Sequence, residues 1–385
     1  MDTYSFSLMP DSPRPGYEQQ FIGELLAKAD IRLNGTEPWD IRVNDHRFYS
    51  SVLRDGSLGL GESYMAGFWD SPSPDTTLYK LLSADLETRV GRSLKIMLYR
   101  LAGRLFNGQS LKQVRRDVPR HYDLGNDLFA MMLDERMIYS CAYWQGARTL
   151  EEAQEKKLDL ICRKLHLERG QRLLDIGCGW GGLAGYAAEK YGVEVVGITL
   201  SEEQARLARE RHAHLPVTIC LQDYRNLTGQ FDRVVSVGMM EHVGYKNYRR
   251  YMQVVHQALK ADGLFLLHCI GSDTSVNRTD PWINRYIFPN GMMPSLRQIA
   301  AAAEGLWVME DWHNFGTDYD LTLMEWRRRF NAAWPALKAA YSETFYRMWD
   351  YYLCCSAASF RAKKNKLWQM VFSKPGNHRI YTPVR

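Results

Sequence analysis

Glycines, carboxylates and histidines gather at a few points of this sequence, and their spacing indicates where chemistry takes place. The segment GCGWGG (177–182) directly follows an apolar run, QRLLDIG (171–177). Glycines between a strand and a helix let a ligand approach backbone that a side chain would block. Glu241 and His242 follow another apolar run, and His268 lies near the end of the next one. The sequence therefore predicts a nucleotide site with polar side chains near it. On these residues alone, Glu241 as a helix cap and His268 as a core residue remain the favoured alternative.

The glycine-rich segment also indicates which nucleotide it holds. Gly177, Gly179 and Gly182 satisfy the spacing of a dinucleotide fingerprint, which further requires an acidic residue about 20 residues on. The next apolar run ends in GITL (197–200) without a carboxylate, whereas Asp223 follows the run after that. An Asp directly before the glycines, as in LDIGCG, resembles the class I S-adenosylmethionine-dependent methyltransferases more than the dehydrogenases. We therefore favour S-adenosylmethionine over a dinucleotide.

Apolar runs alternate with helical segments around these residues. The runs that we expect to be strands are 171–177, 193–200, 217–223, 231–240 and 263–270. The segments that we expect to be helices are 183–192, 201–213 and 246–260. Ser201 and Gln204 match a capping box at the start of one of them. This alternation predicts an α/β fold with a parallel, doubly wound sheet, whose ligands bind beyond the carboxyl ends of the strands.

The composition excludes several classes of protein. The chain has 385 residues, of which 45% are hydrophobic and 24% charged, unlike disordered, collagen-like or disulfide-scaffold chains. No run reaches the ~18 apolar residues of a membrane-spanning helix, and the N-terminus lacks a signal-peptide pattern. The seven cysteines form no CxxC pair, so we expect a reducing compartment, either the cytoplasm or the cytoplasmic face of a membrane. His212 and His214 lack a third ligand at suitable spacing, and we predict no metal site.

Positive charge is concentrated ahead of the predicted sheet. Residues 92–120 contain eight Lys or Arg and one Asp, a net charge of +7, compared with +5 for the whole chain. Within this stretch, 92–106 has apolar residues at helical spacing. Such a pattern is typical of a basic amphipathic helix on an anionic membrane, or of a core-facing surface helix followed by a solvated linker. No base-reading motif accompanies it, so we expect no nucleic-acid partner.

The sequence changes character at this basic stretch. We predict a smaller, mainly helical N-terminal domain at 1–106, a linker at 107–120 and a catalytic domain at 121–385. The N-terminal part reads as several short helices, with GSLGLGESYM (56–65) as a glycine-rich connection between them. Because this connection does not follow a clear strand, we do not expect it to bind phosphate.

Eight segments, in order along the chain, resemble the cyclopropane fatty acid synthases, which methylate unsaturated chains of membrane phospholipids. These segments are HYDLGNDLF (121–129), MIYSCAYW (137–144), LDIGCGWGGL (174–183), GITLSEEQ (197–204), VGMMEHVG (237–244), LHCIGS (267–272), DPWINRYIFPNG (280–291) and EDWHNFGTDYDLTLMEW (310–326). The related mycolic acid cyclopropane synthases are similar only over the catalytic part. This chain also has the N-terminal region of the phospholipid enzymes, so the resemblance covers nearly all of it.

The resemblance implies a reaction in which a cis double bond takes the methyl group of S-adenosylmethionine and leaves a carbocation. A base then removes a proton from the added methyl group, and a ring closes. Water near the cation would give an alcohol, so we expect a dry, apolar pocket. In the family, a bound bicarbonate ion acts as this base. By motif, the residues around it are Glu241, His268 and Tyr319 through side chains, and Cys141 and Ile270 mainly through backbone.

The resemblance also implies which residues hold S-adenosylmethionine. Those near its methionine end are Tyr139, Ser140, Gly177 and Gly179. Those near the ribose and the adenine are Thr199, Leu200, Gln204, Gln222, Asp223 and Tyr224. The capping role expected for Gln204 competes with this ligand role, because one amide cannot serve both at once.

A C-terminal segment, YYLCCSAASF (351–360), bears on the role of cysteine. Some relatives carry a Cys there that has been proposed as catalytic, but here Ser356 takes its place, directly after Cys354 and Cys355. A thiolate has no evident task because no acyl group is transferred. We interpret the two cysteines as buried helix residues.

The resemblance further implies a homodimer that lies on the inner face of the membrane, with the N-terminal domain and the basic helix against the bilayer. Two other functions stay open. One is a methyltransferase of the same fold that gives a methyl-branched, unsaturated or hydroxylated lipid, or acts on a small amine. The other is a non-catalytic lipid-binding protein with a relic nucleotide fold, against which the intact glycines, Glu241 and His268 argue.

Overall fold

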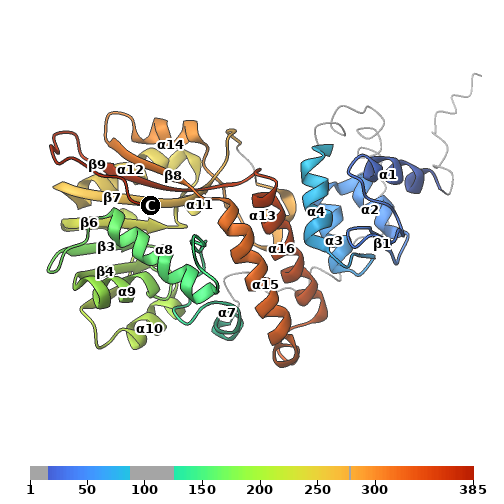
Figure 1. The fold of residues 1–385 in the computed structure, drawn as a ribbon, viewed down its shortest axis with the longest axis horizontal. Helices are drawn as coiled ribbons and strands as arrows, with labels where there is room; N and C mark the ends of the chain where they lie inside the picture. Colours follow the sequence, from blue (N-terminus) through green and yellow to red (C-terminus); the bar gives the residue numbers. More distant parts are fainter. Residues whose placement is uncertain (1–15, 87–124, 277–278) are drawn as a thin grey trace, which may run out of the picture. The chain divides into compact units, whose positions relative to one another are not determined.

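The computed structural model describes residues 16–86, 125–276 and 279–385 (Figure 1). The chain divides into two compact units, residues 1–117 and 118–385. The basic stretch at 92–120, with the predicted amphipathic helix and linker, lies outside the described residues.

The first unit is mainly helical in its described part, as the sequence predicts. Its elements are α1 (Tyr17–Ala27), β1 (Arg42–Val43), α2 (Arg47–Asp55), α3 (Ser57–Met65), β2 (Trp69–Asp70) and α4 (Pro74–Ser83). The two short strands pair in antiparallel fashion. Aromatic rings form its core: Trp69 is fully buried, and its ring lies 4.9 Å from that of Tyr64 and 6.3 Å from that of Phe48, centroid to centroid.

The glycine-rich segment 56–65 is a helix, so the prediction of a connection there is wrong. Gly56 has φ 60° and ψ −125° and makes the turn that separates α2 from α3. A Cβ on Gly59 would lie 1.9 Å from the carbonyl oxygen of Ser51. The glycine therefore serves close packing of α3 on α2, a tertiary contact that outweighs the low helix propensity of the segment.

The second unit contains a seven-stranded sheet whose strand order is β5-β4-β3-β6-β7-β9-β8. The strands are β3 (Arg172–Ile176), β4 (Glu194–Thr199), β5 (Val217–Leu221), β6 (Phe231–Val237), β7 (Leu259–Gly271), β8 (Val308–Asn314) and β9 (Lys366–Ser373). Strands β3 to β7 pair in parallel, which confirms the five predicted strands and the doubly wound fold. Strand β9 is antiparallel to both of its neighbours, a feature that the sequence analysis did not predict.

Helices cover both faces of this sheet. They are α8 (Leu150–Lys164), α9 (Gly182–Tyr191), α10 (Glu202–Arg211), α12 (Tyr248–Ala258) and α14 (Leu296–Ala303). Leu173 of β3 packs in a cluster with residues of α8 and α9, whereas Leu174 packs in a second cluster with residues of α12 and α14. Successive side chains of a strand point to opposite faces, so each face of the sheet has an apolar core.

The remaining elements of this unit lie at the ends of the strands or beside them. They are α7 (Asn126–Met132), η2 (Tyr224–Asn226), α11 (Met240–Val243), η3 (Tyr245–Asn247), α13 (Pro281–Tyr286), α15 (Thr317–Leu337) and α16 (Glu343–Arg361). The long helices α15 and α16 run side by side (Figure 1). Two ion pairs join them, Arg327 to Asp350 at 2.7 Å and Arg361 to Asp320 at 2.8 Å. Within the described residues, no helix is long and apolar enough to cross a bilayer.

Candidate active site

The glycine loop begins where β3 ends. Gly177 and Gly179 have φ values of +82° and +55°, which L-residues rarely adopt. A Cβ on Gly179 would meet nothing within 4 Å, and one on Gly177 would meet only Met239, at 3.5 Å. A Cβ on Gly182, by contrast, would lie 2.5 Å from the carbonyl oxygen of Arg136. The first two glycines therefore leave open space beside the backbone, as ligand binding requires, and the third serves packing.

Asp175, in the LDIG segment (174–177) at the end of β3, is a polar residue that the predicted site omitted. Its side chain is buried, and its Oδ2 atom has no hydrogen-bond partner in the described structure. Burial raises the pKa of this carboxyl from 3.8 to about 7. An unpartnered carboxylate oxygen beside a glycine loop fits the cationic amine that S-adenosylmethionine carries. In the sequence, the Asp before the glycines indicated which class of nucleotide binds, but it was not predicted to contact the ligand itself.

Residues after β4 form a small hydrogen-bond network. The Thr199 hydroxyl donates to Oε1 of Gln204 at 3.0 Å, and the Gln204 N–H donates to Ser201 Oγ at 3.3 Å. Only half of the predicted capping box is present, because the Gln204 side chain bonds Thr199 instead of the helix start. Leu200 is two-thirds exposed. The side chain of Gln204 therefore does not cap the helix start, and its ligand role stays a prediction.

Residues after β5 are engaged with their own turn. The Asp223 carboxylate accepts the N–H of Arg225 at 2.8 Å and pairs with its guanidinium at 2.6 Å. Gln222 donates to the carbonyl of Asn226 at 2.7 Å. The ring of Tyr224 is buried against Tyr251, 5.1 Å away between centroids. All three residues expected near adenine therefore have partners within the protein. Gln222 and Asp223 bond within their own turn, and the ring of Tyr224 packs in the core.

Glu241 and His268 are both buried and both carry an unpartnered polar atom. Oε1 of Glu241 accepts the backbone N–H of Ile270 at 2.6 Å, while Oε2 has no partner in the described structure. Nδ1 of His268 lies 3.3 Å from Nε2 of Gln369 on β9, while Nε2 of His268 has no such partner. Glu241 is therefore not the cap of a following helix, and His268 is not a fully satisfied core residue. Buried polar groups without partners are rare and call for a functional explanation.

Burial sets the protonation of this pair. It raises the pKa of Glu241 from 4.5 to about 7, although the hydrogen bond from Ile270 acts in the opposite direction. Burial, with help from the charges of Lys157 and Lys164, lowers the pKa of His268 well below 6.5. At neutral pH the imidazole of His268 is thus uncharged, and the carboxyl group of Glu241 can hold a proton.

Tyr319, Tyr139 and Cys141 come from other parts of the chain. Tyr319 is half-buried in the first turn of α15, and burial raises its pKa, with further contributions from Tyr352, Cys141 and Glu241. The ring of Trp326 lies 6.1 Å from that of Tyr319 and 5.1 Å from that of Tyr139, so these two tyrosines share one region. The Tyr139 hydroxyl lies 2.9 Å from that of Tyr352 on α16. Cys141 is fully buried, and burial holds its thiol pKa well above 9.0.

Aromatic rings surround these polar groups. The ring of Phe315 lies 6.0 Å from that of His268, and the ring of Tyr139 stacks on Trp326 at 5.1 Å. Phe288 lies 5.9 Å from Tyr352. These apolar walls reduce the access of water and present π-faces that attract cations by about 0.5–2 kcal/mol each. Aromatic rings therefore lie against His268 near the end of β7 and against Tyr139 and Tyr352.

Comparison with known proteins identifies the family of this chain. A family model described as mycolic acid cyclopropane synthetase matches residues 109–370. The cyclopropane-fatty-acyl-phospholipid synthase of Escherichia coli is 56% identical over 355 residues, which are 92% of this chain and 93% of that protein. The chain belongs to the cyclopropane synthase family.

Solved structures agree with this membership. The cyclopropane synthase MmaA2 from Mycobacterium tuberculosis has a TM-score of 0.62 and 31% identity, and covers 66% of this chain and 96% of its own. Mycolic acid cyclopropane synthase CmaA1, in complex with SAH and CTAB, has a TM-score of 0.61 and 33% identity over 66% of this chain and 96% of its own. This member of the family is thus an S-adenosylmethionine-dependent methyltransferase with the class I fold.

The thiols of the two adjacent cysteines of this cyclopropane synthase contact residues of their own helix, α16. Cys354 is buried with its Sγ 4.0 Å from Asp350, and the Cys355 thiol donates to the carbonyl of Tyr352 at 3.3 Å. Both lie inside α16, as interpreted from the sequence, but only Cys354 is buried and Cys355 is partly exposed. The residue through which α16 reaches the site is Tyr352, which the sequence analysis missed.

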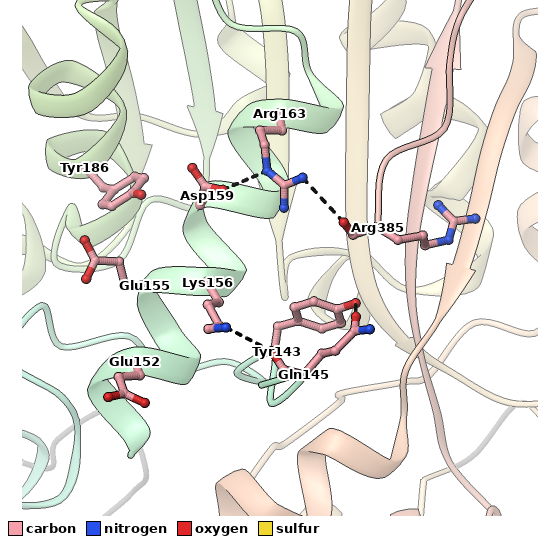
Figure 2. A pocket seen from close by; sticks show the side chains of 9 residues that line it. All are labelled: Tyr143, Gln145, Glu152, Glu155, Lys156, Asp159, Arg163, Tyr186 and Arg385. Atoms are coloured by element: carbon pink, nitrogen blue, oxygen red, sulfur yellow. Dashed lines mark hydrogen bonds and ion pairs between the residues drawn. The ribbon is translucent and has the colours of Figure 1, made fainter. Parts of the chain in front are cut away.

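A separate surface pocket of about 530 Å³ contains no predicted site residue. Figure 2 shows the side chains that line it, among them Lys156, Asp159 and Arg163 from the outer face of α8. Charges of both signs pair within it, as Arg163 does with Asp159 at 2.7 Å. Its polar, open character does not suit an acyl chain or a cation intermediate.

Proposed function

We propose that this enzyme transfers a methylene group from S-adenosylmethionine to the cis double bond of unsaturated acyl chains in phospholipids, forming a cyclopropane ring. The observation that carries the proposal is the buried pair Glu241 and His268, each with a free polar atom, inside aromatic walls. An alkene has no acidic proton and needs no base at the start. A methyltransferase for an alkene therefore needs a dry cavity and one proton acceptor for the last step, and these residues supply that environment.

We assign the methyl donor to the glycine loop and its neighbours. When bound there, S-adenosylmethionine supplies an electrophilic methyl group on a sulfonium ion. Gly177 and Gly179 leave space for it, and Asp175 offers a carboxylate oxygen that lacks a partner. Further contacts are assigned to Tyr139, Ser140, Thr199, Leu200, Gln204, Gln222, Asp223 and Tyr224, the last by backbone.

We assign a bicarbonate ion to the space between Glu241, His268 and Tyr319. Such an ion supplies a base of carboxylate strength without a flexible side chain. A protonated Glu241 can donate to it, and Nε2 of a neutral His268 can donate or accept. The N–H of Ile270 is already bound to Glu241, so Ile270 orients that carboxyl group. Cys141 lines the same region with a thiol that stays protonated, which leaves its backbone as the contact.

The chemistry on the lipid follows from these assignments. The π electrons of the double bond form a bond to the methyl carbon while the C–S bond breaks, and its electron pair stays on the sulfur of the departing S-adenosylhomocysteine. The other carbon of the former double bond is left as a cation. The acceptor takes one proton from the new methyl group, and the electron pair of that C–H bond closes the ring. Phe315 beside His268 and the stacked pair Tyr139–Trp326 keep water from the cation.

We further propose that residues 1–106 form a lipid-binding domain, that 107–120 link it to a catalytic domain at 121–385, and that the enzyme acts as a homodimer on the cytoplasmic face of the membrane. The net charge of +7 over 92–120 supports the membrane contact. Each cation near an anionic surface contributes about 1 kcal/mol.

The test is to incubate the purified protein with S-adenosylmethionine and vesicles of unsaturated phospholipid, and to analyse the fatty acids. We expect acyl chains that have gained one CH₂ and lost their double bond. A methyl-branched product would instead match the tuberculostearic acid methyltransferase UfaA1 of Mycobacterium tuberculosis, which is 36% identical over 84% of this chain. Failure to bind S-adenosylmethionine would favour a non-catalytic lipid-binding protein.

A further inference from the structure

Helix α8 supports the segment that carries Tyr139, Ser140 and Cys141. The Gln154 amide donates to the carbonyl of Ser140 at 2.9 Å, and Nζ of Lys157 donates to the Ser140 hydroxyl at 2.8 Å. Gln154 and Lys157 are three residues apart and share one face of the helix. Ser140 is therefore fixed at its backbone and at its side chain by one rigid element.

Lys157 is an unusual residue for this role. Its side chain is 1% exposed, and a buried ammonium is costly unless charges or hydrogen bonds compensate it. Asp134 is near enough to influence it, but that carboxylate already accepts the N–H groups of Arg136 and Ile138 at 3.0 and 2.9 Å. Within the described residues, the hydrogen bond recorded for the ammonium is the one to Ser140.

The charge of Lys157 acts on Asp175 beside the glycine loop and on His268. It favours the ionised form of Asp175, the carboxyl beside the glycine loop, and it opposes protonation of His268. Burial lowers the pKa of Lys157 itself to about 8, so the ammonium form persists at neutral pH. An apolar side chain of similar length would fill the same space at lower cost to folding, which argues that the charge has a task.

We propose that Lys157, together with Gln154, is a positioning residue of the methylene transfer. It fixes Ser140 and thereby holds Tyr139 and Cys141 where the methyl donor and the proton acceptor meet. The proposal rests on the function proposed above for residues 139–141. A displacement of about 1 Å in a reacting geometry can reduce the rate by roughly 100-fold, so loss of this support should slow the reaction more than it weakens binding.

The neighbouring Lys156 provides a matched control on the same helix. It is exposed, and its Nζ donates to the carbonyl of Gln145 at 3.1 Å, on the outer face of α8 that Figure 2 shows. Lys157→Met and Lys156→Met therefore remove the same charge from adjacent positions, one inside the protein and one outside.

The experiment uses the full chain with S-adenosylmethionine and unsaturated phospholipid vesicles, and compares both variants, Ser140→Ala and the double variant Lys157→Met/Ser140→Ala. We expect Lys157→Met to lower kcat by about 10–100-fold, with a smaller rise in KM for S-adenosylmethionine. The fraction of methyl-branched or hydroxylated chains should rise relative to ring product. Lys156→Met should match wild type. Because Ser140 is also assigned a contact to S-adenosylmethionine, kcat is compared at a saturating concentration of that donor. There the double variant should have the kcat of Lys157→Met, since both changes break the contact between Lys157 and Ser140.

Ring formation by wild type tests the proposed function separately, because it is measured in the same assay without any substitution. Given an active wild type, an unchanged kcat and product ratio in Lys157→Met would overturn the inference. So would kcat losses of the two single variants that multiply in the double variant at saturating S-adenosylmethionine. If Lys157→Met does not fold, Gln154→Leu is the variant that tests the inference. It removes the other hydrogen bond to Ser140. A wild-type kcat in this variant would also overturn the inference.

Discussion

The glycine loop after β3 and the pair formed by Glu241, after β6, and His268, near the end of β7, are built by different means. The loop depends on backbone, with positive φ angles and open space at Gly177 and Gly179. The pair depends on buried side chains whose polar atoms lack partners. The first arrangement suits a large, polar ligand held at many points, and the second suits a small group held in a dry place. Substitutions in the two regions should therefore separate binding from ring formation.

Removing either member of the buried pair should have the largest effect. Glu241→Gln and His268→Ala should reduce ring formation by about 100–10,000-fold, the usual range for a lost acid–base group. Binding of S-adenosylmethionine, measured by titration calorimetry, should stay close to wild type because the loop is intact. His214→Ala, at an exposed position, is the control. Full ring formation by both site variants would remove the proposed anion site.

Protonation of Glu241 should also appear in the pH dependence of stability. Its folded pKa of about 7 lies above the ordinary 4.5, so the folded state binds more protons than the unfolded state between these values. Its contribution to stability is therefore lost as the pH rises through that window. Measured by urea unfolding, the stability of Glu241→Gln relative to wild type should grow by about 2–3 kcal/mol from about pH 5 to about pH 8.

The matched control for that measurement is Glu210→Gln, on an exposed position of α10. Its difference from wild type should be the same at both pH values. A constant difference for Glu241→Gln as well would show that the carboxyl is ionised like an exposed one, and would contradict the dry cavity.

Substitutions in the glycine loop should weaken the binding of S-adenosylmethionine and leave ring formation by the bound complex unchanged. Gly179→Ala places a Cβ in open space at a positive φ, a strain of about 1–2 kcal/mol, and should weaken S-adenosylmethionine binding by roughly 10-fold. The ratio of ring to side products should not change. Gly182→Ala, which would press on the carbonyl oxygen of Arg136, should instead lower the melting temperature. Wild-type affinity in Gly179→Ala would mean that the loop does not face the ligand.

The smallest effect is expected at the cysteines of α16. Cys355→Ala removes a thiol that bonds within its own helix, so kcat should remain within about twofold of wild type. A much larger loss in a fully folded variant would reopen the question of an essential thiol.

The same contrast explains what the sequence could predict. Gly177 and Gly179 were recognisable because a backbone requirement leaves a local motif, and the five parallel strands because apolar runs alternate with helices. The antiparallel β9 was missed since its place between β7 and β8 depends on long-range pairing. Helix α3 was misread because Gly59 is selected by packing on Ser51.

Within the site, local sequence motifs could not predict every residue that contributes. Resemblance named Glu241 and His268, but nothing local indicated that Lys157 lies inward while Lys156 lies outward, or that Tyr352 meets Tyr139. Those facts depend on how α8 and α16 pack, and they become visible only when segments more than 200 residues apart, such as Tyr139 and Tyr352, are brought together.

The central claim is that a trapped proton acceptor closes the ring after methyl transfer. The most direct measurement uses S-adenosylmethionine with a fully deuterated methyl group, unsaturated phospholipid vesicles and mass analysis of the acyl chains. The claim predicts a ring carbon that retains two deuterium atoms, with the third lost to the acceptor. A saturated or hydroxylated chain that retains all three as the main product would contradict it.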